Sequence, residues 1–432
     1  MDPTFSAPRG VGGEYVPPSD KSITHRSLML GALCSGTSRI SRPLMTGDCV
    51  STRRCLERLG CVFETEGSGA VVVRGVGVRG FREPRGVLDA ENSGTTTRLL
   101  AGLLAGLPLF AVLTGDDSLL GRPMGRVVEP LRQMGARIEA RDGGRFAPLA
   151  FLPGDGNLRP LSCSLAVPSA QVKSSLMLAA LRAEGPSRIG GKIHSRDHTE
   201  RMLRALGVGL ETGREEIVIS PAPQLSPFET TVPGDISSAA FFIAAALISG
   251  REILVKGCGV NPTRIGFLSA VKRMGAVVDV REEQSALGEP VGSIKVRGGS
   301  LSGTRIEAEE VPELIDEIPL LAVLGMFAKG VTVVRGAEEL RVKESDRLAM
   351  IGRMAESLGA RIELAPDGFS VEGPQKLRPG VVDPHEDHRI AMAAAVAACG
   401  IPGQVTVKGF ECAAVSYPDF VADYRALGGA VA

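Results

Sequence analysis

The sequence predicts an α/β protein built from two similar domains. The chain has 432 residues, which exceeds the size at which one hydrophobic core keeps growing. A second observation is a recurring pattern, in which a short amphipathic helix ends at glycine and a short alternating strand follows. The six glycines of this pattern are Gly60, Gly135, Gly207, Gly275, Gly359 and Gly428. Copies roughly seventy residues apart are too widely spaced for a solenoid repeat, so each marks a complete α/β unit and three units form a domain.

Each of these glycines is expected to end its helix in the left-handed conformation, which glycine adopts without steric cost. The third and fourth copies are separated by the stretch "PAPQLSPFETTVPGD" at 221–235, which is rich in proline and poor in helix signals. We therefore expect the division between the two domains within 215–235.

Composition excludes several classes of protein. Lys+Arg and Asp+Glu are both 49, so the net charge is zero, which argues against a nucleic-acid or membrane-surface protein. The eight cysteines form no CxxC pair, which is typical of a cytosolic protein with free thiols and no structural zinc. The N-terminal "MDPTFSAPRGVGGEY" has no apolar core for a signal peptide. The longest apolar run, 239–248, is too short to span a bilayer and predicts a buried helix.

The start of the helix expected within 17–33, "PPSDKSITHRSLMLGAL", carries basic residues where a helix favours acidic ones. Lys21 and Arg26 lie near its N-terminus, which has a partial positive charge. Their spacing does not place both on one face of a regular helix. Either Lys21 lies in the turn before the helix, or the two cations serve different anionic groups.

The same arrangement recurs at other expected helix starts, within 91–106, 167–183, 194–207, 340–354 and 383–398, and small residues open another at 232–242. The basic residues there are Arg98, Lys173, Arg196, Lys343, Arg347, His388 and Arg389. Small residues let backbone N–H groups approach a ligand, and a cation at the same place is favourable only when an anion binds. The chain contains neither a P-loop nor a GxGxxG fingerprint, so the anion is not obviously a nucleotide.

The acidic segment "EVPELIDEIPLLAVLGMF" at 310–327 places Asp316 and Glu317 inside an apolar run. Two interpretations remain open: Asp316 is the N-cap of a helix with Pro319 in its first turn, or it is a general base. Glu344, beside Lys343, is a second candidate for acid–base chemistry. The absence of GxSxG and HExxH motifs leaves covalent and metal mechanisms without support.

Seven motifs together resemble those of the enolpyruvyl transferases, in the same order and nearly end to end. They are "SDKSITHR", "ENSGTTTR", "LLGRPMGR", "SAQVKSS", "ELIDEIP", "RVKESDR" and "EDHRIAM". The resemblance implies a monomer of two domains, each an inside-out α/β barrel of three βαβαββ repeats, with the active site in the cleft between them. It places 18–228 in the first domain, and 1–17 with 229–432 in the second.

The closest likeness is to members that transfer the enolpyruvyl group of phosphoenolpyruvate to the 5-hydroxyl of shikimate 3-phosphate, without a cofactor or metal. The resemblance implies that Asp316 takes the hydroxyl proton, and that Glu344, with Lys21, protonates the phosphoenolpyruvate methylene. The implied contacts to shikimate 3-phosphate are Lys21, Ser22, Arg26, Ser169, Ala170, Gln171, Ser195, Arg196, Asp316 and Lys343. The implied contacts to phosphoenolpyruvate are Lys21, Gly94, Arg122, Gln171, Arg347 and Arg389.

Three positions depart from the pattern of some members. Ala170 stands where a second serine occurs, Glu339 where asparagine occurs, and Val415 where a lysine that contacts phosphoenolpyruvate occurs. Gly94 is the residue usual in glyphosate-sensitive members, whereas "SAQVK", "RDHTE" and "NSGTTTR" resemble the tolerant subclass.

Two alternatives remain. Members acting on UDP-N-acetylglucosamine carry a cysteine where this chain has Asp117. A non-catalytic anion-binding protein would have no need of Asp316 and Glu344 opposite the cations.

Overall fold

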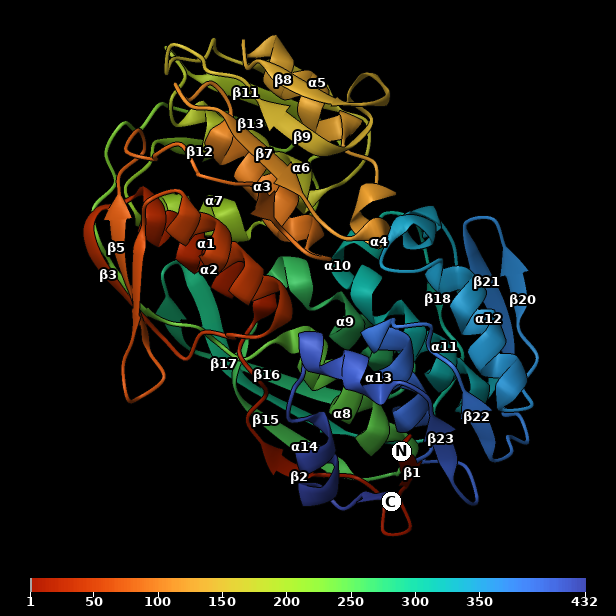
Figure 1. Cartoon of the computed structure of the whole chain (residues 1–432). Helices are drawn as coiled ribbons and strands as arrows, with labels where there is room; N and C mark the ends of the chain where they lie inside the picture. Colours follow the sequence, from red (N-terminus) through yellow and green to blue (C-terminus); the bar gives the residue numbers. More distant parts are fainter. Residues whose placement is uncertain (1) are drawn as a thin grey trace. The chain divides into compact units, whose positions relative to one another are not determined.

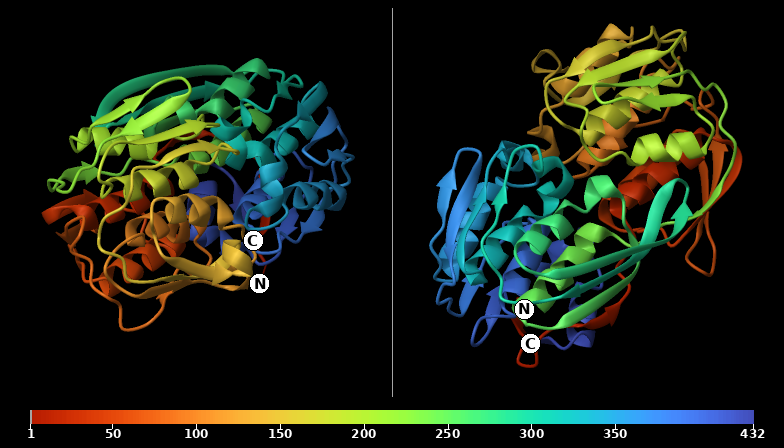
Figure 2. Two further views of the ribbon diagram at one scale, coloured as in Figure 1. Left: turned by 90° about the horizontal axis from the view of Figure 1, so that it is seen from above. Right: turned by 180° about the vertical axis from the view of Figure 1, so that it is seen from behind.

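The computed structural model describes residues 2–432, which form two compact units (Figures 1 and 2). Unit 1 comprises the chain up to Pro18 together with 233–284 and 290–432. Unit 2 comprises 19–232 and the short segment 285–289. The chain passes from unit 2 to unit 1 at Val232/Pro233.

Unit 2 contains three four-stranded sheets with the same topology. In each sheet an edge strand runs parallel to its neighbour, and the next two strands are antiparallel. The first has the order β14 (Glu229–Thr231), β3 (Ser35–Ser41), β5 (Val71–Val76), β4 (Val62–Thr65). The second is β6 (Leu88–Asp89), β7 (Ala111–Thr114), β9 (Phe146–Phe151), β8 (Ile138–Arg141). The third is β10 (Ser162–Leu165), β11 (Ser187–Gly191), β13 (Glu216–Ile219), β12 (Leu210–Thr212).

Unit 1 repeats this plan. Its sheets are β16 (Val277–Ala286), β17 (Glu289–Arg297), β15 (Glu252–Gly259), β2 (Gly13–Tyr15); and β18 (Arg305–Ile306), β19 (Gly330–Val334), β21 (Gly368–Gly373), β20 (Glu363–Ala365). The last is β22 (Gly380–Val382), β23 (Val405–Val407), β1 (Thr4–Ser6), β24 (Ala430–Val431). The N-terminal strands β1 and β2 therefore complete two sheets of unit 1, and β1 pairs with both β23 and β24.

Three helices in each unit are buried on almost every side and form its core. In unit 2 they are α1 (Lys21–Leu33), α3 (Gly94–Leu104) and α6 (Ala170–Ala180), and in unit 1 they are α8 (Ile236–Ile248), α11 (Ile318–Phe327) and α13 (His388–Ala397). A helix that is apolar all round is a core element. The apolar run at 239–248 is indeed a buried helix, and no helix in residues 2–432 is long and apolar enough to cross a membrane.

Six amphipathic helices alternate with the buried ones along the chain. They are α2 (Gly47–Arg58), α5 (Gly125–Gln133), α7 (His198–Ala205), α9 (Gly266–Arg273), α12 (Arg347–Ser357) and α14 (Phe420–Ala426). Shorter helical segments are α4 (Asp117–Leu120), α10 (Val311–Leu314) and the 3₁₀ turns η1 (Asp142–Gly144), η2 (Pro262–Arg264), η3 (Ile315–Glu317), η4 (Glu338–Val342) and η5 (Phe410–Val415). Each amphipathic helix ends two residues before one of the six glycines of the recurring pattern, all of which have positive φ, between 76° and 109°. The sequence-based prediction of six helix–glycine–strand junctions is confirmed.

Candidate functional site

Unit 1 gathers a cluster of charges around the buried side chain of Arg347, the first residue of α12. The Arg347 guanidinium donates from Nε to Asp387 Oδ2 at 2.9 Å, from Nη1 to Asp316 Oδ1 at 3.2 Å and from Nη2 to Glu344 Oε2 at 2.5 Å. Arg389, near the start of α13, lies 3.5 Å from Asp316 Oδ2 and also donates to the Asp316 carbonyl at 3.4 Å. We call these five residues the Arg347 cluster. It unites four residues that the sequence assigned to the site, and adds Asp387.

Asp316 is not the N-cap of a helix, so that interpretation of the sequence is wrong. It lies inside the 3₁₀ turn η3, which leads directly into α11, and the cap position of α11 is Glu317 without a capping side-chain bond. Pro319 does lie in the first turn of α11, as expected. Since its backbone is already helical, the Asp316 carboxylate does not cap and instead contacts the two guanidinium groups.

The electrostatics of the Arg347 cluster keep its arginine charged. Burial opposes the charge of Arg347, but Asp387, Glu344 and Asp316 outweigh it and raise the pKa of Arg347. Burial likewise opposes ionisation of Asp387, and the Arg347 guanidinium holds the pKa of Asp387 below its usual value. Burial lowers the pKa of Lys343, an effect that Asp316 and Glu344 partly offset. The cations hold these carboxylates in fixed orientations, and general acid–base catalysis requires such positioning.

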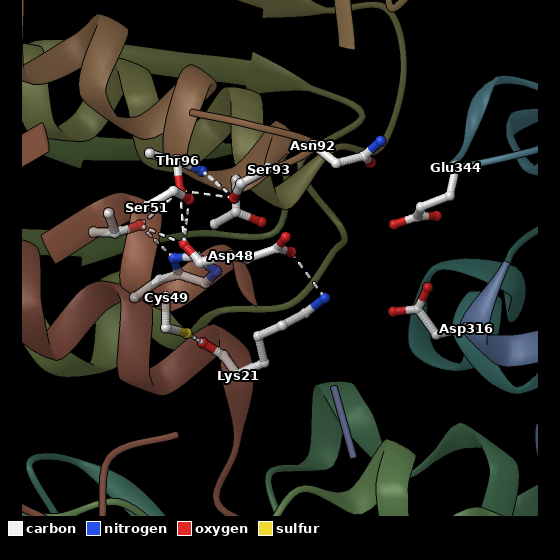
Figure 3. A network of polar contacts seen from close by, with 12 residues as sticks. Lys21, Asp48, Cys49, Ser51, Asn92, Ser93, Thr96, Asp316 and Glu344 are labelled. Carbon is white, nitrogen blue, oxygen red and sulfur yellow. Dashed lines mark hydrogen bonds and ion pairs between the residues drawn. The ribbon is translucent and has the colours of Figure 1, made fainter. Parts of the chain in front are cut away.

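Unit 2 places Lys21 against Asp48 (Figure 3). Lys21 is the first residue of α1 and follows the N-cap Asp20, so it does not lie in the turn before the helix. Its Nζ is 3.0 Å from Asp48 Oδ2, and both side chains are 14% exposed. The Asp48 carbonyl accepts from the hydroxyls of Ser51 and Thr96, which fixes the start of α2 beneath the ammonium group. Lys21 is therefore a positioned cation with access to solvent.

Two further guanidinium groups approach the start of α3. A Cβ atom on Gly94 would lie 3.0 Å from Arg98 Nη1 and 3.2 Å from Arg122 Nη1, so only glycine leaves these two cations undisturbed. Arg98 Nη1 donates to Gln171 Oε1 at 2.5 Å, and Gln171 Nε2 donates to Thr95 Oγ1 at 2.9 Å. The structure thus brings together Gly94, Arg122 and Gln171, all predicted phosphoenolpyruvate contacts. A helix N-terminus with two guanidinium groups is an anion-binding arrangement.

Arg26 is buried in unit 2 and donates hydrogen bonds to residues of three helices. It donates from Nε to Thr199 Oγ1 at 2.7 Å, from Nη2 to Ser174 Oγ at 2.9 Å and from Nη1 to the Ser22 carbonyl at 3.0 Å. Burial lowers the pKa of Arg26 to about 10, which still leaves it charged at neutral pH. Arg26 therefore joins α1, α6 and α7.

The remaining predicted residues lie on loops or helix starts of unit 2. Ser169 is the N-cap of α6, its Oγ accepting from the Val172 N–H at 3.4 Å, and Ala170 is the first residue of that helix. Ser195 and Arg196 lie on the segment between β11 and α7 and are partly buried. Val415 ends the 3₁₀ turn η5 of unit 1.

Sequence reasoning assigned no role to Asp48 or Asp387, and it noted Arg98 only as a basic residue at a helix start. Arg98 and Asp387 both lie inside motifs quoted above. The motifs therefore identified the segments that form the site without identifying every side chain in it. Asp48 had no such signal, because its pairing with Lys21 depends on the packing of α2 against α1.

The fold identifies the class of protein first. An enolpyruvyl transferase from Streptomyces tendae, NikO, covers the whole of this chain with a TM-score of 0.75 at 20% identity, a likeness that shows the shared fold. EPSP synthase from Acinetobacter baumannii superimposes with a TM-score of 0.88 at 37% identity, covering all of both chains. The architecture is that of the enolpyruvyl transferases.

The family follows from the sequence comparisons. The model of the family described as EPSP synthase (3-phosphoshikimate 1-carboxyvinyltransferase) matches residues 6–423. A 3-phosphoshikimate 1-carboxyvinyltransferase of Pelotomaculum thermopropionicum is 48% identical over 425 residues, 97% of each chain. One of Herpetosiphon aurantiacus is 46% identical over 431 residues, 99% of each chain. The chain belongs to the EPSP synthase family.

Proposed function

We propose that the Arg347 cluster and the cationic helix starts of unit 2 carry the reaction of this family. The chain is a 3-phosphoshikimate 1-carboxyvinyltransferase of the shikimate pathway. It transfers the enolpyruvyl group of phosphoenolpyruvate to the 5-hydroxyl of shikimate 3-phosphate and releases phosphate. Both substrates carry a carboxylate and a phosphate, which accounts for the basic residues at the starts of α1, α3, α12 and α13.

The observation that carries the mechanism is the sharing of one guanidinium by Asp316 and Glu344. Arg347 orients both carboxylates, and in this proposal Asp316 takes the proton of the 5-hydroxyl while Glu344, with Lys21, protonates the methylene carbon of phosphoenolpyruvate. Bond formation between the 5-oxygen and C2 gives a tetrahedral intermediate. Glu344 then takes back a proton from the new methyl group, Asp316 returns its proton to the departing phosphate, and cleavage of the bond from C2 to the phosphate oxygen forms the enol ether of the product. Fixed charges aimed at the reacting groups stabilise such a transition state without reorganisation.

The substrate contacts are proposed residue by residue. Gly94, Arg122, Gln171, Arg347, Arg389 and Lys21 bind phosphoenolpyruvate. Lys21, Ser22, Arg26, Ser169, Ala170, Gln171, Ser195, Arg196, Asp316 and Lys343 bind shikimate 3-phosphate. The contact between Arg98 and Gln171 and the approach of Arg122 to Gly94 support the proposed set of phosphoenolpyruvate-binding residues. A monomeric enzyme in the cytoplasm completes the proposal.

The test is an assay of phosphate release with each substrate alone and with both. Release only in the presence of both phosphoenolpyruvate and shikimate 3-phosphate is the expected result. Release with UDP-N-acetylglucosamine in place of shikimate 3-phosphate would instead assign the chain to the other substrate class. Binding of both substrates without any turnover would favour an anion-binding protein.

A further inference from the structure

A buried ion pair in unit 2 lies directly beneath the segment that carries Ser195 and Arg196. Lys173 Nζ and Glu200 Oε1 are 2.6 Å apart, and each side chain is only 2% exposed. The same ammonium group donates to the Ile193 carbonyl at 3.1 Å and to the Ser195 carbonyl at 3.3 Å. A lysine has three donors, and these three acceptors occupy them. Lys173 therefore has no donor left for a substrate, although its motif begins at the start of α6.

The contacts of Lys173 fix the direction of two peptide groups. In a planar trans peptide the C=O and the following N–H point in opposite directions. Because the Ile193 and Ser195 carbonyls point at Lys173, the N–H groups of His194 and Arg196 point to the opposite face of the segment. Carbonyl oxygens repel a phosphate and N–H groups attract it, so this orientation turns the attractive face of the segment outward.

Glu200 has a second role beside this segment. It lies next to Thr199, which accepts from Arg26, and its charge offsets the burial of the Arg26 guanidinium. Glu200 thus compensates two buried cations, Lys173 and Arg26. The pair couples α6, the segment 193–196 and the start of α7 into one arrangement.

We infer that Lys173 is a positioning residue for the phosphate of shikimate 3-phosphate, acting through the carbonyls of Ile193 and Ser195 with Glu200 as its counterion. The inference rests on the proposed function, in which Ser195 and Arg196 meet that phosphate. Lys173 binds no substrate atom itself. Its hydrogen bonds turn two carbonyl oxygens away from the phosphate, so that two N–H groups face the phosphate instead.

The test replaces the whole pair, since removing one partner would leave a buried charge uncompensated. Lys173→Met with Glu200→Met keeps the approximate volume and leaves no buried charge at either position. Because Arg26 also loses the charge of Glu200 in this variant, Lys173→Arg, which retains Glu200, isolates the contribution of Lys173. Affinity is measured for shikimate 3-phosphate and for shikimate, which lacks the phosphate. We expect binding of shikimate 3-phosphate to weaken by roughly tenfold to a hundredfold, the loss typical of hydrogen bonds to a charged group. Affinity for shikimate and the KM for phosphoenolpyruvate remain unchanged.

Arg182→Met is the matched control. Arg182 is another buried cation of unit 2, and it donates to the carbonyls of Gly102 and Ala105 at 3.2 and 2.6 Å, at the end of α3 rather than in the segment 193–196. Its replacement is expected to lower the thermal stability and to leave the ratio of the two affinities as in the unmodified protein. An unchanged ratio in the Lys173/Glu200 double variant would overturn the inference.

A second variant covers the case in which the double variant does not fold. Lys173→Arg retains the charge, but a planar guanidinium does not place one nitrogen at the point where three acceptors meet. We expect a smaller loss, of about threefold or more, that is again confined to shikimate 3-phosphate. An unchanged affinity in folded Lys173→Arg would contradict the inference. If the unmodified protein itself bound shikimate 3-phosphate no better than shikimate, the proposed function would fail, and the inference with it.

Discussion

Asp316 owes its proposed role to the contacts of a single carboxylate. Its two oxygens face Arg347 at 3.2 Å and Arg389 at 3.5 Å, so its orientation is set from two helix starts of unit 1. The charge of Asp316 also contributes to the elevated pKa of Arg347. A change at Asp316 therefore tests proton transfer and the charge balance of the cluster together.

Asp316→Asn keeps the shape of the side chain and removes the base. We expect kcat to fall by about a hundredfold or more, the usual contribution of general acid–base catalysis. The Kd for shikimate 3-phosphate, measured by calorimetry, should change by less than about threefold, because an amide oxygen still accepts a hydrogen bond. Normal turnover by Asp316→Asn would eliminate its role as base.

Gly94 offers a second test at a single atom. A methyl group there would lie 3.0 Å from Arg98 Nη1 and 3.2 Å from Arg122 Nη1, so both guanidinium groups must move in Gly94→Ala. We expect the KM for phosphoenolpyruvate to rise by roughly tenfold to a hundredfold, since small displacements of charged ligands carry such costs. The affinity for shikimate 3-phosphate should remain unchanged. If that affinity fell while the KM for phosphoenolpyruvate stayed the same, Gly94 would belong to the shikimate 3-phosphate site.

His25 is a buried imidazole of helix α1. Its Nδ1 lies 2.7 Å from Thr52 Oγ1, and burial, with the charges of Lys21 and Arg26, lowers the pKa of His25 to about 3 despite the opposing charge of Asp48. The folded pKa thus lies below the unfolded value of about 6.5, so the unfolded chain binds more protons between these values. The stability that a neutral His25 allows is present above about pH 6.5 and is lost progressively as the pH falls toward 3.

His25→Asn keeps a polar group near Thr52 and removes this titration. Between pH 7 and pH 5 the unmodified protein should lose about 2 kcal/mol of unfolding free energy more than the variant does. Urea unfolding followed by circular dichroism at both pH values measures the difference. Equal pH dependence in the two proteins would show that His25 does not titrate on unfolding.

At the scale of elements, the six helix-ending glycines explain why the repeats were visible in the sequence. Each amphipathic helix is joined to the following strand by only three to five residues, and a glycine in the left-handed conformation makes so short a turn possible. The helix–glycine–strand pattern involves only neighbouring residues, so it could be recognised from the sequence alone. The Lys21–Asp48 pair, the Arg98–Gln171 contact and the burial of Lys173 depend on the packing of helices that are distant in the chain, and no local pattern predicted them.

Gly207 allows the cost of a left-handed backbone to be measured separately from the steric effect of an added Cβ. It has a φ of +81°, and a Cβ atom placed on it would meet nothing within 4 Å. Gly207→Ala should therefore lower the unfolding free energy by about 1 kcal/mol through the left-handed backbone alone.

The matched control is Gly67→Ala. A Cβ on Gly67 also meets nothing within 4 Å, and its φ lies outside the left-handed region. We expect this substitution to be neutral or stabilising by up to about 0.5 kcal/mol, because it restricts the unfolded chain. Equal effects of the two substitutions in urea unfolding would contradict the assignment of Gly207 as a conformational helix stop.

At the scale of the whole molecule, the two units divide the proposed roles. Unit 2 supplies Lys21, Gly94, Arg122 and Gln171, whereas unit 1 supplies the acid–base carboxylates and the two arginines that hold them. The motifs and the family resemblance predicted which of these residues each unit supplies. They did not indicate that residues 285–289, which comprise the end of β16, the turn after it and the start of β17, group with unit 2, because this depends on contacts formed only in the folded chain.

The pairing of β1 with β24 has a consequence for the order of events during synthesis on the ribosome. The Thr4 N–H donates to the Ala432 carbonyl at 2.9 Å, so the first and last strands of the chain share one sheet of unit 1. Residues 19–232, nearly all of unit 2, emerge as one continuous stretch while the first eighteen residues wait for partners. Domains generally fold as units in the order of their emergence. Unit 2 can therefore assemble while translation continues, whereas the last sheet of unit 1 closes only after β24 has left the exit tunnel.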